Sequence, residues 1–138
     1  MLTGLWTAGI KVPDLEKELA FQKALGSTVV LDDTIIFEGE SFRIPLLRMG
    51  DKYLHLAEKM VYERMLAQPL PCGIVHLVYM SDSFARDVEA AISAGASCFI
   101  GPSEVAAGFG RRNVAFLRAP SGYIFEIIEI LENRVPPV

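Results

Sequence analysis

The sequence is short of charged residues, cysteine and histidine. Of its 138 residues, 22% are charged and 51% are hydrophobic, and it contains two cysteines and two histidines. This is more hydrophobic material than a monomer of this size easily buries, so we expect a homodimer whose interface covers part of it. The length predicts one domain, because either half alone would be too small to be stable.

Several classes of partner are disfavoured by what is missing. The net charge is -4, and no Lys/Arg cluster is longer than Arg111 and Arg112, so nucleic acid is not an expected partner. No apolar run approaches the roughly 18 residues that span a bilayer, and the amino-terminal segment has no signal-peptide pattern. We therefore expect a cytoplasmic protein without membrane contact. Cys72 and Cys98 form no redox or zinc-finger spacing, and we assign them no function.

The first half of the chain predicts a strand, a helix and further strands. Leu5 to Val12 alternates like a strand, and Asp14 is a candidate N-cap for a helix that ends at Gly26. The expected apolar stripe of this helix is Leu15, Leu19, Phe21 and Leu25. Short β-rich segments separated by turn signals follow at 28–31, 34–38, 42–49 and 53–58.

The second half repeats this order. A strand at 73–80 precedes a helix that opens near Asp82 or Ser83 and closes at Gly95. Its expected apolar stripe is Phe84, Val88, Ala91 and Ile92, and further strands are expected at 97–101, 113–118 and 123–130. Gly26 and Gly95 occupy the same point of each half, so the repeat is roughly 69 residues long.

The repeat predicts an α+β fold of two tandem βαβββ modules. The modules span about 1–60 and about 73–138, with a connector at 61–72. We expect the helices to cover one face of a curved mixed sheet whose other face encloses a cavity, and we expect the function to lie there. A ferredoxin-like sandwich is a minor alternative, because its βαββαβ order has too few strands for residues 34–58.

Three segments carry a resemblance to a known superfamily: "GIKVPDLEKELAFQKALGS", "GIVHLVYMSD" and "FLRAPSGYIFEIIEI". Together they resemble the vicinal oxygen chelate proteins, which include glyoxalases, bleomycin-resistance proteins and extradiol dioxygenases. The resemblance covers nearly the whole chain. Its most specific part is the Pro-x-Gly turn before a strand whose glutamate points into the cavity. The agreement of order, spacing and internal duplication carries the assignment.

The resemblance implies a divalent metal and its ligands. Metal-using members place one ligand on the first and one on the last strand of each module. Thr7 stands where a histidine is usual, and His55 stands where a glutamate is usual, whereas His76 and Glu126 match. Two imidazoles and a carboxylate suit Fe, Mn, Ni, Co or Zn and leave room for two adjacent oxygens of a small substrate. In isomerases and lyases of this kind, Glu126 would also be the catalytic residue that moves a proton.

Strand alternation supports the same three residues without the resemblance. It places Glu126 in one row with Ile124 and Ile128, where a bare carboxylate needs a proton, a cation or a metal. The structural alternative is that His76 is a core histidine, that His55 bonds a neighbour, and that Glu126 pairs with Lys11 or Arg118.

Candidate substrate contacts are Lys11, Arg111, Arg112 and Tyr123. Lys11 shares a strand face with Thr7 and could reach the cavity mouth. Arg111 and Arg112 could form a mobile lip that holds a carboxylate or phosphate, although a solvated turn is the more common outcome. Tyr123 could line an aromatic pocket, or it could simply belong to the core.

The sequence therefore favours a metal-dependent lyase, isomerase or dioxygenase acting on a small substrate. Catechol ring cleavage is disfavoured, because Phe116 stands where the extradiol signature has a tyrosine and no histidine remains as acid or base. The alternative is a metal-free protein that sequesters a small molecule, as bleomycin-resistance relatives do. Thr7 favours that alternative.

Overall fold

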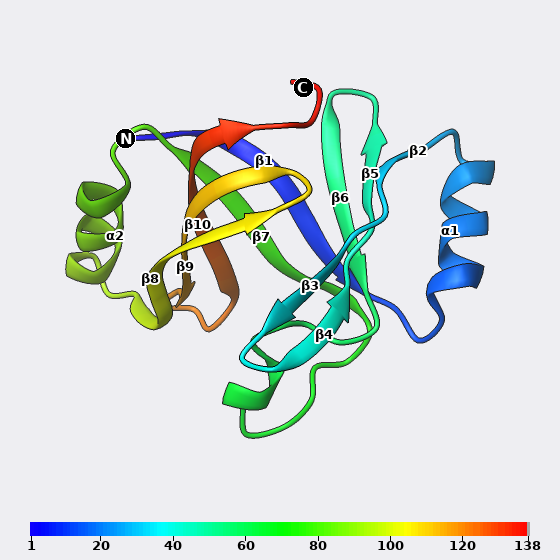
Figure 1. Ribbon diagram of the computed structural model, residues 1–138. Helices are drawn as coiled ribbons and strands as arrows, with labels where there is room; N and C mark the ends of the chain where they lie inside the picture. The colour runs from blue at the N-terminus through cyan, green and yellow to red at the C-terminus, as the bar shows by residue number, and fades with distance from the viewer. Residues whose placement is uncertain (138) are drawn as a thin grey trace. The chain divides into compact units, whose positions relative to one another are not determined.

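The computed structural model describes residues 1–137, which fall into two compact units (Figure 1). The first unit comprises residues 7–75 and 135–137, and the second comprises Met1–Trp6 and His76–Arg134. Each unit thus holds most of one predicted module together with a short segment from the other end of the chain. Strand β1 (Leu2–Lys11) contributes to both units.

The first unit contains a βαβββ arrangement and an additional hairpin. Its sheet has the strand order β2-β5-β6-β1, and β6 runs parallel to β1. The elements are α1 (Leu15–Ala24), β2 (Thr28–Leu31), β5 (Leu46–Met49) and β6 (Lys52–Ala57). The hairpin consists of β3 (Thr34–Phe37) and β4 (Glu40–Arg43), and the connector contains the short 3-10 helix η1 (Glu63–Met65).

The second unit repeats the same connections. Its sheet has the order β7-β10-β9-β8, and β10 runs parallel to β7 and antiparallel to β9. The elements are β7 (Gly73–Ser81), α2 (Phe84–Ser93), β8 (Ser97–Ala107), β9 (Gly110–Arg118) and β10 (Ile124–Asn133). The predicted tandem βαβββ modules are confirmed, and the βαββαβ alternative is wrong.

Each helix covers one face of its own sheet (Figure 1). In the first unit, Leu15 and Leu19 of α1 pack with Leu47 and Leu56. In the second unit, α2 contributes Phe84 and Val88 to a cluster with Ala115, Leu117, Ala119, Phe125 and Ile127. Burial of these side chains orients each sheet, because alternate residues along its strands must then face the other way.

The predicted helix ends are confirmed, whereas part of the predicted stripes is wrong. The Asp14 carboxylate accepts a hydrogen bond from the Lys17 amide at 3.1 Å, and Gly26 adopts a left-handed φ of +99°. Phe21 and Leu25 are exposed, and Gln22 is buried in their place with its side-chain oxygen accepting from Ser27. Ile92 of α2 is also exposed.

The predicted strands at 42–49 and 97–101 have different limits in the structure. The first is two strands, because Pro45 lacks the N–H that a continuous ladder requires. The second extends to Ala107, and β9 begins at Gly110, so only Gly108 and Phe109 form the turn between them. Among residues 1–137, no helix is long and apolar enough to cross a membrane.

Candidate functional site

The four ligand positions implied by the resemblance are divided between the units. Thr7 and His55 belong to the first unit, and His76 and Glu126 belong to the second. Each pair lies on two neighbouring parallel strands, β1 with β6 and β7 with β10.

His76 and Glu126 share one face of the second unit's sheet. His76 is in register with Ile124, and Glu126 is in register with Val78. Because residues in register point to the same side, and because the side alternates along a strand, His76 and Glu126 are diagonal neighbours. The residues flanking Glu126 in sequence, Phe125 and Ile127, pack in the core beneath α2. The pair therefore faces away from the helix, as strand alternation predicts.

The surroundings of this pair are apolar. His76 is 7% exposed, and its imidazole packs edge-on against the Phe116 ring with the centroids 5.8 Å apart. Phe116 is the partner of Glu126 on β9, and Ile124 and Ile128 on either side of Glu126 are buried. The protein groups in this row offer little polarity to stabilise a charge.

The Glu126 carboxyl shows the consequence of this environment. Burial raises the pKa of Glu126 to about 8, because the charged form loses hydration that no neighbour replaces. Within the part of the chain that the structure describes, no hydrogen bond or ion pair involves this carboxyl. The Arg118 guanidinium, one of its expected partners, instead donates to the Gly122 carbonyl at 3.0 Å.

The first unit repeats the same geometry with different residues. Thr7 is in register with Tyr53, and Gly9 is in register with His55. Thr7 and His55 are therefore diagonal neighbours, in the same relation as His76 and Glu126. Leu54 and Leu56 belong to the cluster beneath α1, so His55 lies on the opposite face. The structural repeat thus makes Thr7 the counterpart of His76 and His55 the counterpart of Glu126.

The Thr7 side chain is buried and bonded within the sheet. Its side chain is 1% exposed, and its hydroxyl donates to the Tyr53 carbonyl at 2.8 Å. The hydroxyl proton is thereby committed to the backbone of β6. Thr7 thus has a small side chain, bonded to the neighbouring strand, at the position where the resemblance implies an imidazole.

The donor chemistry of the second unit fits a divalent metal. An imidazole and a carboxylate on one largely apolar face are two of the groups that such ions bind. Over residues 1–137, no three His, Cys, Asp or Glu side chains are gathered closely enough to hold an ion. Of the three predicted ligands, His76 and Glu126 lie in the second unit, and His55 lies in the first.

Lys11 is held by the connector. Its ammonium forms an ion pair with Glu63 at 2.7 Å and donates to the Leu70 carbonyl at 2.7 Å. Burial alone would raise the pKa of Glu63, but hydrogen bonds from Lys11 and from the amides of Met60 and Leu70 outweigh it and lower that pKa. Lys11 also lines a cleft, so its predicted contact with a substrate stays a prediction.

The two arginines of the predicted lip lie on β9 rather than in a loop. The exposed Arg111 pairs with Glu104 and Glu132. Arg112 is 1% exposed, and its guanidinium donates to the carbonyls of Phe109 and Glu132 and to the Asn133 side chain. The expectation that both lie in a loop is therefore wrong, and their contact with a substrate anion stays a prediction.

Arg112 also stacks on two rings. Its guanidinium carbon lies 4.9 Å from the Phe109 ring centroid and 5.5 Å from that of Trp6. Burial lowers the pKa of Arg112. These contacts give Arg112 a role in holding the end of β10.

Tyr123 lies outside the face of His76 and Glu126. It is 49% exposed, packs against Phe125, and its hydroxyl lies 3.4 Å from that of Tyr79. The hydrogen bond with Tyr123, together with burial, raises the pKa of Tyr79 to about 12. In these interactions, neither Tyr79 nor Tyr123 contacts His76 or Glu126.

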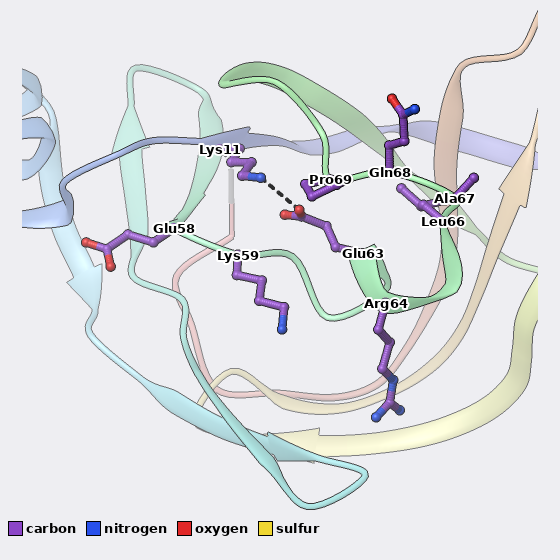
Figure 2. A pocket seen from close by; sticks show the side chains of 9 residues that line it. All are labelled: Lys11, Glu58, Lys59, Glu63, Arg64, Leu66, Ala67, Gln68 and Pro69. Carbon is purple, nitrogen blue, oxygen red and sulfur yellow. Dashed lines mark hydrogen bonds and ion pairs between the residues drawn. The ribbon is translucent and has the colours of Figure 1, made fainter.

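Sequence reasoning missed the charged cleft of the first unit. The cleft has a volume of about 450 Å³ and is lined by residues from β1, the end of β6 and the connector: Lys11, Glu58, Lys59, Glu63, Arg64, Leu66, Ala67, Gln68 and Pro69 (Figure 2). A connector with scattered charges has no periodicity, so its path over Lys11 could not be read from the sequence.

Comparison with known proteins places the fold. No family model and no curated protein sequence matches the chain. Among solved structures, a single-substitution variant of methylmalonyl-CoA epimerase from Streptomyces coelicolor, in complex with 2-nitronate-propionyl-CoA, has a TM-score of 0.73 at 21% identity. The match covers 96% of this chain and 100% of the epimerase.

Two further structures give the same result. The hypothetical protein BH1468 from Bacillus halodurans C-125 has a TM-score of 0.71 at 21% identity, over 94% of this chain and 96% of its own. Methylmalonyl-CoA epimerase from Mycobacterium tuberculosis has a TM-score of 0.66 at 20% identity, over 93% and 88%. The chain therefore has the fold of these structures, the glyoxalase and bleomycin-resistance fold that the sequence predicts.

Proposed function

We propose that this protein is a metal-dependent enzyme that binds a small substrate through two adjacent oxygens and moves a proton on it. The observation that supports the proposal most directly is the largely apolar sheet face on which the Glu126 carboxyl lies diagonally beside His76. A charged carboxyl in such a place destabilises the fold unless it is protonated or paired with a cation. Carboxyls with strongly shifted pKa values are found most often at functional sites.

His76, Glu126 and His55 are the proposed ligands. The metal would supply a Lewis acid that stabilises negative charge on the substrate oxygens. The Phe116 ring packs edge-on against the His76 imidazole and so helps to fix its orientation. Thr7 is not among the proposed ligands, and its hydroxyl donates to the β6 backbone.

Glu126 is also the proposed proton carrier. Released from the metal, the Glu126 carboxyl would regain its pKa of about 8, close to neutrality, where an acid can both give and take a proton efficiently. The reaction class that fits is removal and return of a proton at a carbon beside a carbonyl group. The similarity in fold to epimerases in complex with methylmalonyl-CoA or its analogue supports this choice over ring cleavage.

Metal analysis of purified protein tests the proposal. Protein prepared without chelator should contain about one divalent ion per chain. The variants Glu126→Gln, His76→Ala and His55→Ala should each lose most of it. Glu89→Gln, an exposed glutamate on α2, is the matched control and should retain it. Metal-free wild-type protein that also fails to take up Fe(II), Mn(II), Ni(II), Co(II) or Zn(II) would overturn the proposal.

A second candidate function is metal-free binding of a small hydrophobic molecule. The buried, backbone-bonded hydroxyl of Thr7 favours it, because one of the usual imidazoles is absent. This candidate requires that ligand affinity be the same with and without chelator. A loss of binding on metal removal would reject it.

A further inference from the structure

The cleft of the first unit contains cationic side chains that the proposed function does not use. Of the residues that line it, Lys11, Lys59 and Arg64 are cationic, and Glu58 and Glu63 are anionic. None of the five belongs to the proposed ligand set, so the cleft can be tested separately from the metal.

Both carboxylates that line the cleft are committed to internal partners. Glu63 pairs with Lys11 at 2.7 Å, and the two side chains are 5% and 13% exposed, respectively. Glu58 accepts a hydrogen bond from the Leu15 amide at the start of α1, at 2.9 Å. In Figure 2 Glu58 is turned away from the other side chains, while a dashed line joins Lys11 to Glu63. The cations left to meet a ligand are therefore Lys59 and Arg64.

Lys59 and Arg64 form ion pairs with glutamates of the neighbouring β3–β4 hairpin. The Lys59 ammonium lies 2.7 Å from the Glu40 carboxylate, and the Arg64 guanidinium is paired with Glu38. Arg64 also lies over the Phe37 ring, 5.5 Å from its centroid. Both ion pairs join the segment that follows β6 to the β3–β4 hairpin, in which Glu38 lies in the turn and Glu40 begins β4.

These pairs are weak enough to exchange. Lys59 and Glu40 are 50% and 40% exposed, and Arg64 and Glu38 are 32% and 56% exposed. Exposed ion pairs contribute about 0 to 1 kcal/mol, so an incoming anion can displace the glutamates at little cost. Glu38 in addition has a left-handed φ of +50°, which a non-glycine residue rarely adopts.

We infer that this cleft is a second ligand site, which takes a phosphate group or a comparable dianion between Lys59 and Arg64 in place of Glu40 and Glu38. Lys59 provides a point charge, and Arg64 provides a planar fork of donors that matches two oxygens of one anion. In Figure 2 both side chains extend to the same side of the connector. Leu66, Ala67 and Pro69 form the apolar part of the lining, against which the rest of such a ligand can pack.

Titration with inorganic phosphate tests this inference. Wild-type protein, followed by amide NMR shifts at constant ionic strength, should bind phosphate saturably, with the shifts concentrated at residues 37–40 and 58–69. The double variant Lys59→Ala/Arg64→Ala should lose this binding. Lys52→Ala is the matched control, because Lys52 is 49% exposed and pairs with the adjacent Asp51, and it should bind like wild type.

Removal of the two competing carboxylates should increase the affinity for phosphate. The double variant Glu38→Gln/Glu40→Gln should bind phosphate about tenfold more tightly, because the cations are then free. Thermal unfolding of each variant confirms that it is folded. The inference is overturned if wild type shows no saturable binding, or if Lys59→Ala/Arg64→Ala binds phosphate as tightly as wild type.

Discussion

At the scale of single residues, Glu126 places a carboxyl among apolar side chains in the second unit. Its carboxyl lies in an apolar row beside Phe116 and Ile128, and burial raises its pKa to about 8. In a structural core, such a position would ordinarily hold a leucine or isoleucine. Retaining a glutamate there costs stability unless a cation neutralises it, which links this residue to the proposed metal.

The stability of the metal-free protein should therefore depend on pH through Glu126. The folded pKa is above the unfolded value, so the unfolded chain releases this proton first as pH rises. Stability therefore falls between about pH 4.5 and 8, and the full penalty is present above pH 8. Glu126→Gln should thus stabilise the protein by on the order of 3 kcal/mol at pH 9 and by little at pH 4. Urea unfolding with chelator measures this. A difference that is equal at both pH values would contradict the assignment.

Arg112 is also buried, and its hydrogen bonds within the second unit give it a structural role. Its guanidinium holds the backbone of Phe109 and Glu132 together, and it stacks on Trp6. Arg112→Ala should lower the free energy of unfolding by about 3 kcal/mol, because it leaves those carbonyls unsatisfied and opens a cavity. Arg111→Ala, at the adjacent exposed position, should change it by less than about 0.5 kcal/mol. Equal effects in denaturant unfolding would contradict this role.

At the scale of elements, the alternation of strands was sufficient to assign faces. It placed Glu126 with Ile124 and Ile128, and the register of β7 and β10 confirms that row. Local signals also predicted the helix ends, because Asp14 and Gly26 act through the backbone next to them.

Elements that depend on distant partners were predicted less well. The exposure of Phe21 depends on which arc of α1 meets Leu47 and Leu56, and several arcs of this helix contain apolar residues. The extension of β8 and β9 to the turn at Gly108 depends on their pairing with each other. The ion pair of Lys11 with Glu63 depends on the path of the connector. None of these has a local sequence signal.

The β8–β9 hairpin contains a glycine that the backbone requires. Gly110 has a φ of +113°, and a Cβ there would lie 2.0 Å from the Glu132 carbonyl oxygen. Gly110→Ala should therefore cost about 3 kcal/mol or more. Gly39→Ala also changes a left-handed glycine, with φ of +82° but open space around it, and should cost about 1 kcal/mol. Thermal or urea unfolding of both variants measures the contrast, and similar costs would contradict it.

At the scale of the whole molecule, the duplication is the feature that the sequence predicted best. Thr7 pairs with Tyr53 in the first unit, and His76 pairs with Ile124 in the second. In each unit the other predicted site residue, His55 or Glu126, lies two positions after that partner on the last strand. The sequence could not show that Thr7 would bond to the backbone of β6, because that contact requires the paired strand.

Self-association remains a prediction at this scale. Several large apolar side chains are exposed in the second unit: Leu2, Leu5, Tyr123, Ile130 and Leu131. Burying such side chains between two copies would recover hydrophobic free energy. Light scattering coupled to size exclusion should give twice the chain mass of 15.2 kDa. A mass of one chain at every micromolar concentration would contradict the prediction.

The central claim is that the Glu126 carboxylate binds a divalent cation. Carbon-13 NMR titration of the Glu126 side-chain carboxyl, assigned with Glu126→Gln, measures its protonation directly. The pKa should be about 8 with chelator and should fall below about 5 when Zn(II) or Co(II) is added, because a bound cation stabilises the charged form. A pKa that is the same with and without metal would contradict the claim.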